Sequence, residues 1–208
     1  MITPRTLTAL GCALALSLSV ATPGAHADPP AAAPATGDVT GTVNAEVAKH
    51  KANTVVFVKN AGQGASTGKV TMDQRGLVFD PRVMPIQKGT TVEFLNSDSV
   101  GHNVFTPDNE KYDLGTWPQG QVKSYQFVNA GVYRQLCRVH DDMIAFIVVL
   151  DTKFFGKSDK AGAFKIPALP PGKYTLGVWH EKLAAADVEV EVVAGKPTAV
   201  AIQLGPKK

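Results

Sequence analysis

The sequence predicts an all-β protein built from β-sandwich domains. Short runs of β-branched and aromatic residues recur along the chain, and Gly, Pro and Asn turns separate them. The clearest runs are residues 54–59, 91–95, 124–128 and 187–193. No segment carries a helical hydrophobic period, apart from a single turn expected at 46–51. Short strands at this spacing predict an all-β sandwich architecture with two sandwiches.

Residues 1–27 predict a secretory signal peptide. Arg5 is their only charge, an apolar stretch follows it, and Ala-His-Ala precedes Asp28. The apolar stretch breaks at Thr22, short of the roughly 20 residues that a membrane span requires. Cleavage near Ala27 would export a chain without a membrane span to the periplasm or the medium. Residues 28–37, rich in Pro and Ala, predict a disordered linker.

The mature chain would keep one cysteine, Cys137, because Cys12 leaves with the signal peptide. A lipid anchor on Cys12 is the lesser alternative. An intramolecular disulfide is then impossible, and a lone thiol in an oxidising compartment is usually metal-bound or buried.

The formal net charge falls from +3 to +2 when Arg5 is lost. The sequence has no run of basic residues of the kind that would indicate binding to nucleic acid or to a membrane surface.

Four side chains predict a copper site. Cys137, His140 and Met143 stand in the sequence Cys-Arg-Val-His-Asp-Asp-Met, and His102 lies upstream in Gly-His-Asn-Val. A thiolate, two imidazoles and a thioether form the soft, mixed set that holds copper in both oxidation states. A single cysteine disfavours structural zinc and iron–sulfur sites. We expect a loop after a strand to present three donors, while His102 arrives from a neighbouring strand across the sandwich.

Residues 68–151 resemble the cupredoxins, the plastocyanin- and amicyanin-like type 1 blue copper proteins. The resemblance rests on short motifs in family order: Phe79-x-Pro, Val92-x-Phe-x-Asn-x-Asp, His102-Asn-Val and Cys137-x-x-His-x-x-Met. It implies a Greek-key sandwich with one type 1 copper per chain.

The same resemblance implies a role for each residue of the site. His102, Cys137 and His140 would be equatorial ligands, and Met143 the weak axial ligand. Asn103 would brace the ligand loop from outside the coordination sphere. The structural alternatives are an ordinary core methionine at 143 and an ordinary turn asparagine at 103.

Asp141 and Asp142 depart from the family pattern, which has apolar or proline residues there. They would make the surface beside His140 acidic and favour a basic redox partner, or they are simply solvated loop residues.

Residues 159–179 resemble a second family, the carboxypeptidase regulatory-like and transthyretin-like modules. The resemblance rests on Asp159-x-x-Gly-x-Phe followed by Pro-Gly-x-Tyr, with a Pro-Pro-Gly turn expected to join two strands as a hairpin. The Gly-x-Val start of such a module occurs only before the copper motifs. We therefore expect a discontinuous β-sandwich of residues 38–67 plus 152–205, with a cupredoxin domain at 68–151 inserted. The alternative is one cupredoxin with extra strands at each end.

These features predict a one-electron carrier in a periplasmic redox chain, not an enzyme, with a cytochrome or a dehydrogenase as partner. A nitrite-reductase-like second copper would need three further imidazoles, and only His50 and His180 remain in the mature chain. The alternative function is copper delivery or sensing, or a partner-binding scaffold. His180 is expected to be structural, with a role near the metal or a partner as the alternative.

Overall fold

The structure is a computed structural model that describes residues 35–62 and 64–207. The predicted signal peptide and the part of the predicted linker at residues 28–34 lie outside these residues. Gly37, expected as the last residue of the linker, is already the first residue of a strand. Strand accounts for 54% of the structure and helix for 2%, so the predicted all-β class is confirmed. Among the described residues, no helix is long and apolar enough to cross a membrane.

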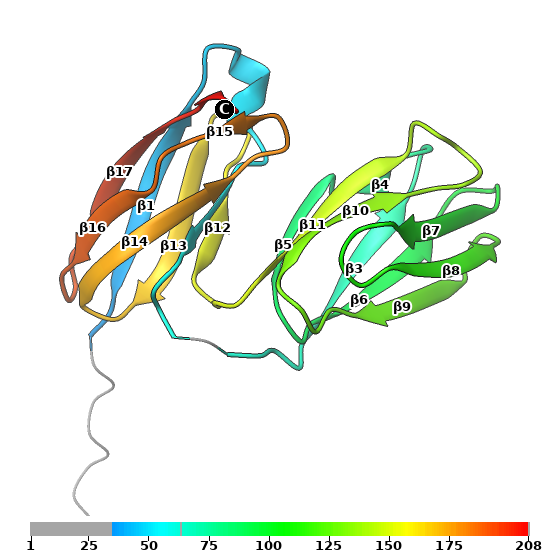
Figure 1. Ribbon diagram of the computed structural model, residues 1–208, viewed down its shortest axis with the longest axis horizontal. Coiled ribbons are helices and arrows are strands. Elements are labelled where there is room, and N and C mark those ends of the chain that lie inside the picture. Colours follow the sequence, from blue (N-terminus) through cyan, green and yellow to red (C-terminus); the bar gives the residue numbers. More distant parts are fainter. Residues whose placement is uncertain (1–34, 63, 208) are drawn as a thin grey trace, which may run out of the picture. The chain divides into compact units, whose positions relative to one another are not determined.

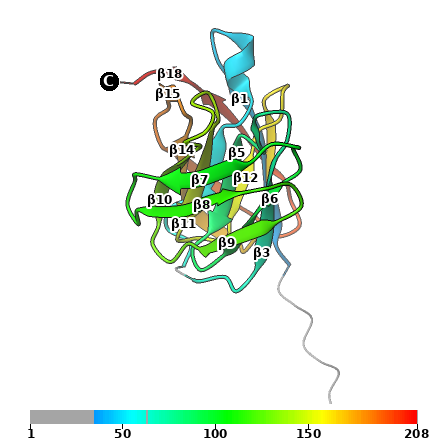
Figure 2. The ribbon, with the colours of Figure 1, turned by 90° about the vertical axis from the view of Figure 1, so that its right-hand side faces the viewer.

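The first sandwich consists of a five-stranded sheet in the order β5-β11-β10-β7-β8 and a four-stranded sheet in the order β4-β3-β6-β9 (Figure 1). Its strands are β3 (Lys69–Gln74), β4 (Phe79–Asp80), β5 (Val83–Gln87), β6 (Thr91–Asn96), β7 (His102–Thr106), β8 (Tyr112–Trp117), β9 (Val122–Gln126), β10 (Gly131–Leu136) and β11 (Ile144–Leu150). In Figure 2, β7 and β8 run next to each other, as their antiparallel pairing requires.

Alternating apolar residues of both sheets form the core of this sandwich. In β6 buried and half-buried positions alternate, as expected for a strand with one face toward a core. The largest side chains that are fully buried here are aromatic: Trp117, Tyr133, Phe94 and Phe127. Cys137 and Met143 belong to the same buried cluster, so the predicted site adjoins a close-packed apolar interior.

The second sandwich pairs strands from both ends of the chain. One sheet has the order β13-β1-β17 and another β12-β2-β14-β16, beside a two-stranded ribbon of β15 and β18. Its elements are β1 (Gly37–Asn44), the short 3-10 helix η1 (Ala48–Lys51), β2 (Val55–Val58), β12 (Phe155–Lys157), β13 (Ala163–Leu169), β14 (Gly172–Trp179), β15 (Leu183–Ala184), β16 (Val188–Val192), β17 (Thr198–Gln203) and β18 (Gly205–Pro206). This pairing is compatible with an inserted copper domain, which remains a proposal.

The hairpin expected around Pro-Pro-Gly is wrong. β13 pairs with β1, whereas β14 pairs with β2 and β16, so the two strands lie in different sheets. Pro170 and Pro171 carry no N–H to donate to a ladder, and the chain uses them to cross from one sheet to the other.

A small apolar cluster connects the strands of the two sandwiches. Its buried members are Val55, Val83, Val148 and Leu150, which come from β2, β5 and β11. Arg82, just before β5, donates a hydrogen bond from Nε to Glu181 Oε2 at 2.9 Å. One face of β11 therefore packs into the core of the first sandwich, and its other face packs against Val55 of β2.

Candidate metal centre

His102, Cys137 and His140 come together as a compact donor set. Their donor atoms all lie within 4.8 Å of one another, and His102 Nδ1 is 3.1 Å from His140 Nδ1. His102 is completely buried, Cys137 is 4% exposed, and His140 is half-buried. Among the described residues, no other group of three His, Cys, Asp or Glu side chains converges in this way.

Strand pairing explains this convergence. β7 and β10 are antiparallel neighbours in one sheet, with Leu136 opposite Phe105. Continuing this register places His102 beside the loop that follows Cys137. His102 thus comes from an adjacent strand, as expected, but from the same sheet and not from across the sandwich.

A short loop carries the remaining donors between β10 and β11. The Met143 N–H donates to His140 O at 3.1 Å, which closes the turn before β11 begins at Ile144. Met143 is 1% exposed and packs in the same core cluster as Cys137. This position suits both an axial ligand and a core residue, so the axial role stays a prediction.

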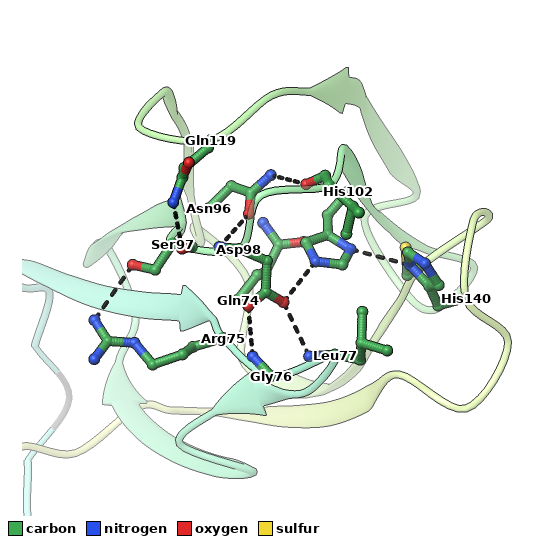
Figure 3. Close-up of polar contacts among 12 residues, drawn as sticks. Gln74, Arg75, Gly76, Leu77, Asn96, Ser97, Asp98, His102, Gln119 and His140 are labelled. Atoms are coloured by element: carbon green, nitrogen blue, oxygen red, sulfur yellow. Dashed lines mark hydrogen bonds and ion pairs between the residues drawn. The ribbon is translucent and has the colours of Figure 1, made fainter.

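Asp98 determines which ring nitrogen of His102 carries a proton. Its Oδ2 lies 2.9 Å from His102 Nε2, and a carboxylate can only accept there, so Nε2 carries the ring proton. The Nδ1 lone pair is then free for a metal. Figure 3 shows the carboxylate of Asp98 between His102 and the backbone of Gly76 and Leu77.

The backbone around Asp98 holds the carboxylate in its charged form. The N–H groups of Leu77 and Gly76 donate to it at 2.9 and 2.6 Å. These two hydrogen bonds, with a smaller contribution from His102, lower the pKa of Asp98 to about 2. Asp98 belongs to the motif that begins at Val92, yet sequence reasoning did not single it out. Its position four residues before His102 was the available signal.

Asn103 lies where the resemblance placed a brace for the ligand loop. Its backbone N–H donates to Cys137 Sγ at 3.5 Å. Its side-chain Nδ2 donates to Asp113 Oδ1 at 2.7 Å, and its Oδ1 accepts from the Arg138 N–H at 3.4 Å. Asn103 therefore contacts both the sulfur donor and the first residue of the loop.

The donor set fits copper. Two metal–nitrogen bonds of about 2 Å reach one ion when the nitrogens lie within about 4 Å of each other, and the two Nδ1 atoms satisfy this at 3.1 Å. One thiolate with two imidazoles, at the edge of an apolar core, is the donor chemistry of a blue-copper site.

The outer edge of the site combines apolar and acidic residues. Leu77, Val100 and Val139 are 49%, 43% and 50% exposed, respectively. Val139 precedes His140, and the exposed Asp141 and Asp142 follow it. His140 is thus the donor that reaches the surface.

His180 lies apart from these donors, on the second sandwich. Its Nδ1 accepts from the backbone N–H groups of Lys182 and Leu183 at 3.2 and 3.0 Å. Burial lowers the pKa of His180, which is 4% exposed. These contacts are those of a structural histidine, because Nδ1 must stay unprotonated to accept both bonds. His50 lies nearby, with the two rings 5.8 Å apart.

Two family models match this chain. Residues 66–150 match "Copper binding proteins, plastocyanin/azurin family". Residues 149–200 match "Polysaccharide lyase family 4, domain II". The second match is to a different family from the carboxypeptidase regulatory-like modules, so that resemblance is not confirmed. The first matched segment contains His102, Cys137 and His140, and this donor set fits a type 1 copper.

Solved structures similar to this chain include a nitrite reductase, a cupredoxin and an amicyanin variant. A Cu-containing nitrite reductase (NirK) from Thermus scotoductus SA-01 is 26% identical over 46% of this chain and 25% of its own, with a TM-score of 0.40. A purple cupredoxin from Nitrosopumilus maritimus is 22% identical over 39% of this chain and 99% of its own, with a TM-score of 0.37. A reduced amicyanin variant is 20% identical over 46% of this chain and 98% of its own, with a TM-score of 0.38. This chain therefore spans a quarter of the nitrite reductase.

Proposed function

We propose that this protein is an exported type 1 copper protein that carries single electrons in a periplasmic redox chain. The observation that carries this proposal is the convergence of His102, Cys137 and His140, of which the first two are buried and the third is half-buried and reaches the surface. When bound, copper would supply a one-electron couple, Cu(II) reduced to Cu(I), without protons or bond breaking.

The protein supports such a couple by holding its donors in place. Asp98 orients the completely buried His102, and Asn103 contacts the sulfur of Cys137, which packs in the apolar core. A site that is rigid in both oxidation states needs little rearrangement during electron transfer. Met143 would supply a weak thioether donor that tunes the potential.

The surface beside His140 supports a protein partner. Leu77, Val100 and Val139 are exposed apolar residues that a partner could cover, and the exposed Asp141 and Asp142 add negative charge after His140. We propose that the partner is a cytochrome or dehydrogenase with basic residues around its own electron port, because complementary charge raises the association rate.

We favour a carrier over an enzyme because of the remaining imidazoles. Apart from the site, the described residues contain His50 and His180, and the Nδ1 of His180 already accepts two backbone hydrogen bonds. A second copper of the nitrite-reductase kind would lack its third histidine.

The test is spectroscopic and kinetic. The mature protein should bind one copper per chain, show an intense thiolate-to-copper band that bleaches on reduction, and recover it on reoxidation over many cycles. The proposal would be excluded if the protein bound Cu(II) without developing colour, or if it bound zinc in a closed site instead. Reversible colour combined with ready loss of Cu(I) to a competing copper protein would favour the alternative, copper delivery.

A further inference from the structure

An ion pair outside the donor set connects the strand of His102 to the ligand loop. Asp113, on β8, accepts from Asn103 Nδ2 at one oxygen and from Arg138 Nε at the other, both at 2.7 Å. The Gly115 N–H also donates to the first oxygen at 2.9 Å. A single carboxylate therefore holds Asn103 and Arg138 at once.

Arg138 is the residue directly after Cys137, and three contacts fix it. Its Nε donates to Asp113, its backbone N–H donates to Asn103 Oδ1, and its guanidinium lies over the Phe105 ring at 4.1 Å from the centroid. Such a planar stacked and hydrogen-bonded arrangement restrains an arginine more than a simple charge contact does.

The contact that this arrangement supports is the one between Asn103 and the Cys137 sulfur. The backbone N–H of Asn103 lies 3.5 Å from Sγ, the long end of hydrogen-bond distance for sulfur. Hydrogen bonding at the cysteine sulfur is one of the factors that set the potential of a blue-copper site. A small movement of Asn103 would weaken this donation.

We propose that Asp113 and Arg138 are positioning residues of the copper centre. Together they hold Asn103 so that its N–H points at Cys137 Sγ, and they fix the start of the ligand loop. This inference rests on the copper site proposed above. It differs from a role in stability, because the two side chains are 39% and 60% exposed, and exposed ion pairs contribute little to folding.

Two alanine variants separate positioning from a simple charge effect. Asp113→Ala removes a negative charge near the site, and Arg138→Ala removes a positive one. Through space alone, the first would raise the reduction potential and the second would lower it. Under our proposal both variants lower it, since a weaker N–H contact leaves the thiolate a stronger donor to Cu(II).

The matched control is Arg134→Ala. Arg134, three residues before Cys137, pairs with Asp108 at 2.8 Å and is 48% exposed, and neither residue contacts a donor. We expect Arg138→Ala and Asp113→Ala to lower copper affinity about 10-fold, as loss of outer contacts does at other metal sites, and to shift the charge-transfer band. Arg134→Ala should change neither. Opposite potential shifts in the two test variants, unchanged spectra, or an equal effect of Arg134→Ala would overturn the inference.

A measurement on the copper-free protein keeps the inference separate from the proposed function. In the native protein the Asn103 amide should exchange slowly and Cys137 should react slowly with an alkylating reagent. Both rates should rise in Arg138→Ala but not in Arg134→Ala. If the native protein binds no copper, the proposed function fails, while these rates still report whether Asp113 and Arg138 position Asn103 and Cys137. Equal rates in native protein and Arg138→Ala would show that the pair positions nothing.

Discussion

Asp98 Oδ2 and His102 Nε2 lie 2.9 Å apart, and Asp98 is the link between a metal donor and the turn after β3. The same carboxylate accepts the N–H groups of Gly76 and Leu77, so three donors converge on two oxygens. The imidazole of His102 is therefore oriented by a group that is itself held by backbone. Outer contacts of this kind fix the tautomer of a ligating histidine and raise its basicity.

Asp98→Asn should weaken the site. An amide NH₂ would face an N–H donor whichever way the side chain turned. It would remove the Gly76 hydrogen bond if it replaced Oδ1, and both the Leu77 and His102 hydrogen bonds if it replaced Oδ2. We expect copper affinity to fall about 10-fold. The reduction potential should rise, because His102 becomes a poorer donor to Cu(II). Competition with a chelator and a redox titration would measure the two effects.

Asp73→Asn is the control for the loss of a nearby negative charge. Asp73 accepts from Arg75 Nε and Ser97 Oγ and contacts no donor of the site. If both variants raised the potential equally, the effect of Asp98 would be one of charge and not of orientation.

Met143→Leu tests the axial assignment. The swap conserves volume, so it should cost less than about 1.5 kcal/mol of stability whichever role Met143 has. If Met143 is a ligand, the protein keeps its colour while its potential rises, since the thioether contact stabilises Cu(II). Met84→Leu, another buried methionine of the same core cluster, is the control. Identical potentials in the native protein and Met143→Leu would make Met143 a core residue.

The donors could be predicted from sequence because most of them share one loop. Cys137 and His140 are three residues apart, so their convergence depends on a local turn. Asp113 and Arg138 could not be predicted in this way. Their contact depends on the pairing of β7 with β8, including an irregularity between Asn103 and Phe105, and no local pattern encodes that register.

The strands were easier to predict than their partners. The runs at 54–59, 91–95 and 187–193 match β2, β6 and β16 to within one or two residues. The pairing around Pro170 was wrong, because alternation shows which face of a strand is buried but not which strand lies beside it. Asx-type turns and prolines mark where a strand ends, and both hairpins and crossings between sheets use them.

The proposed insertion of the copper domain predicts an asymmetric response to truncation. A fragment of residues 68–151 should fold and keep the copper spectrum, because it contains β3 to β11 and every donor. It should be less stable than the whole chain, since it exposes Val83, Val148 and Leu150. Each such side chain contributes roughly 1.5–3 kcal/mol when fully buried.

Strands β1 and β2 should not fold without the strands that follow the copper domain. A chain that ends near residue 152 loses β12, β13, β14 and β17, the partners of β1 and β2. NMR should then show residues 38–67 without ordered structure while the copper band persists. If residues 68–151 fold only together with β2, the chain is a single elaborated cupredoxin.

His180 should make the protein less stable as the pH falls from neutrality. Burial lowers its pKa below the ordinary 6.5, and it accepts two backbone N–H groups in the neutral form. The unfolded chain therefore binds a proton at higher pH than the folded one, so the free energy of unfolding decreases as the pH drops below about 6.5 toward the folded pKa. The charged or titratable groups that act on it are Glu181, His50, Lys182 and Lys207.

His180→Gln should lower stability at pH 7.5 and flatten the decline between about pH 7 and 5 relative to the native protein, as measured by urea unfolding. His50→Gln, which changes the neighbouring ring, should keep most of the native slope; an equally steep decline in His180→Gln would assign the pH dependence to other groups.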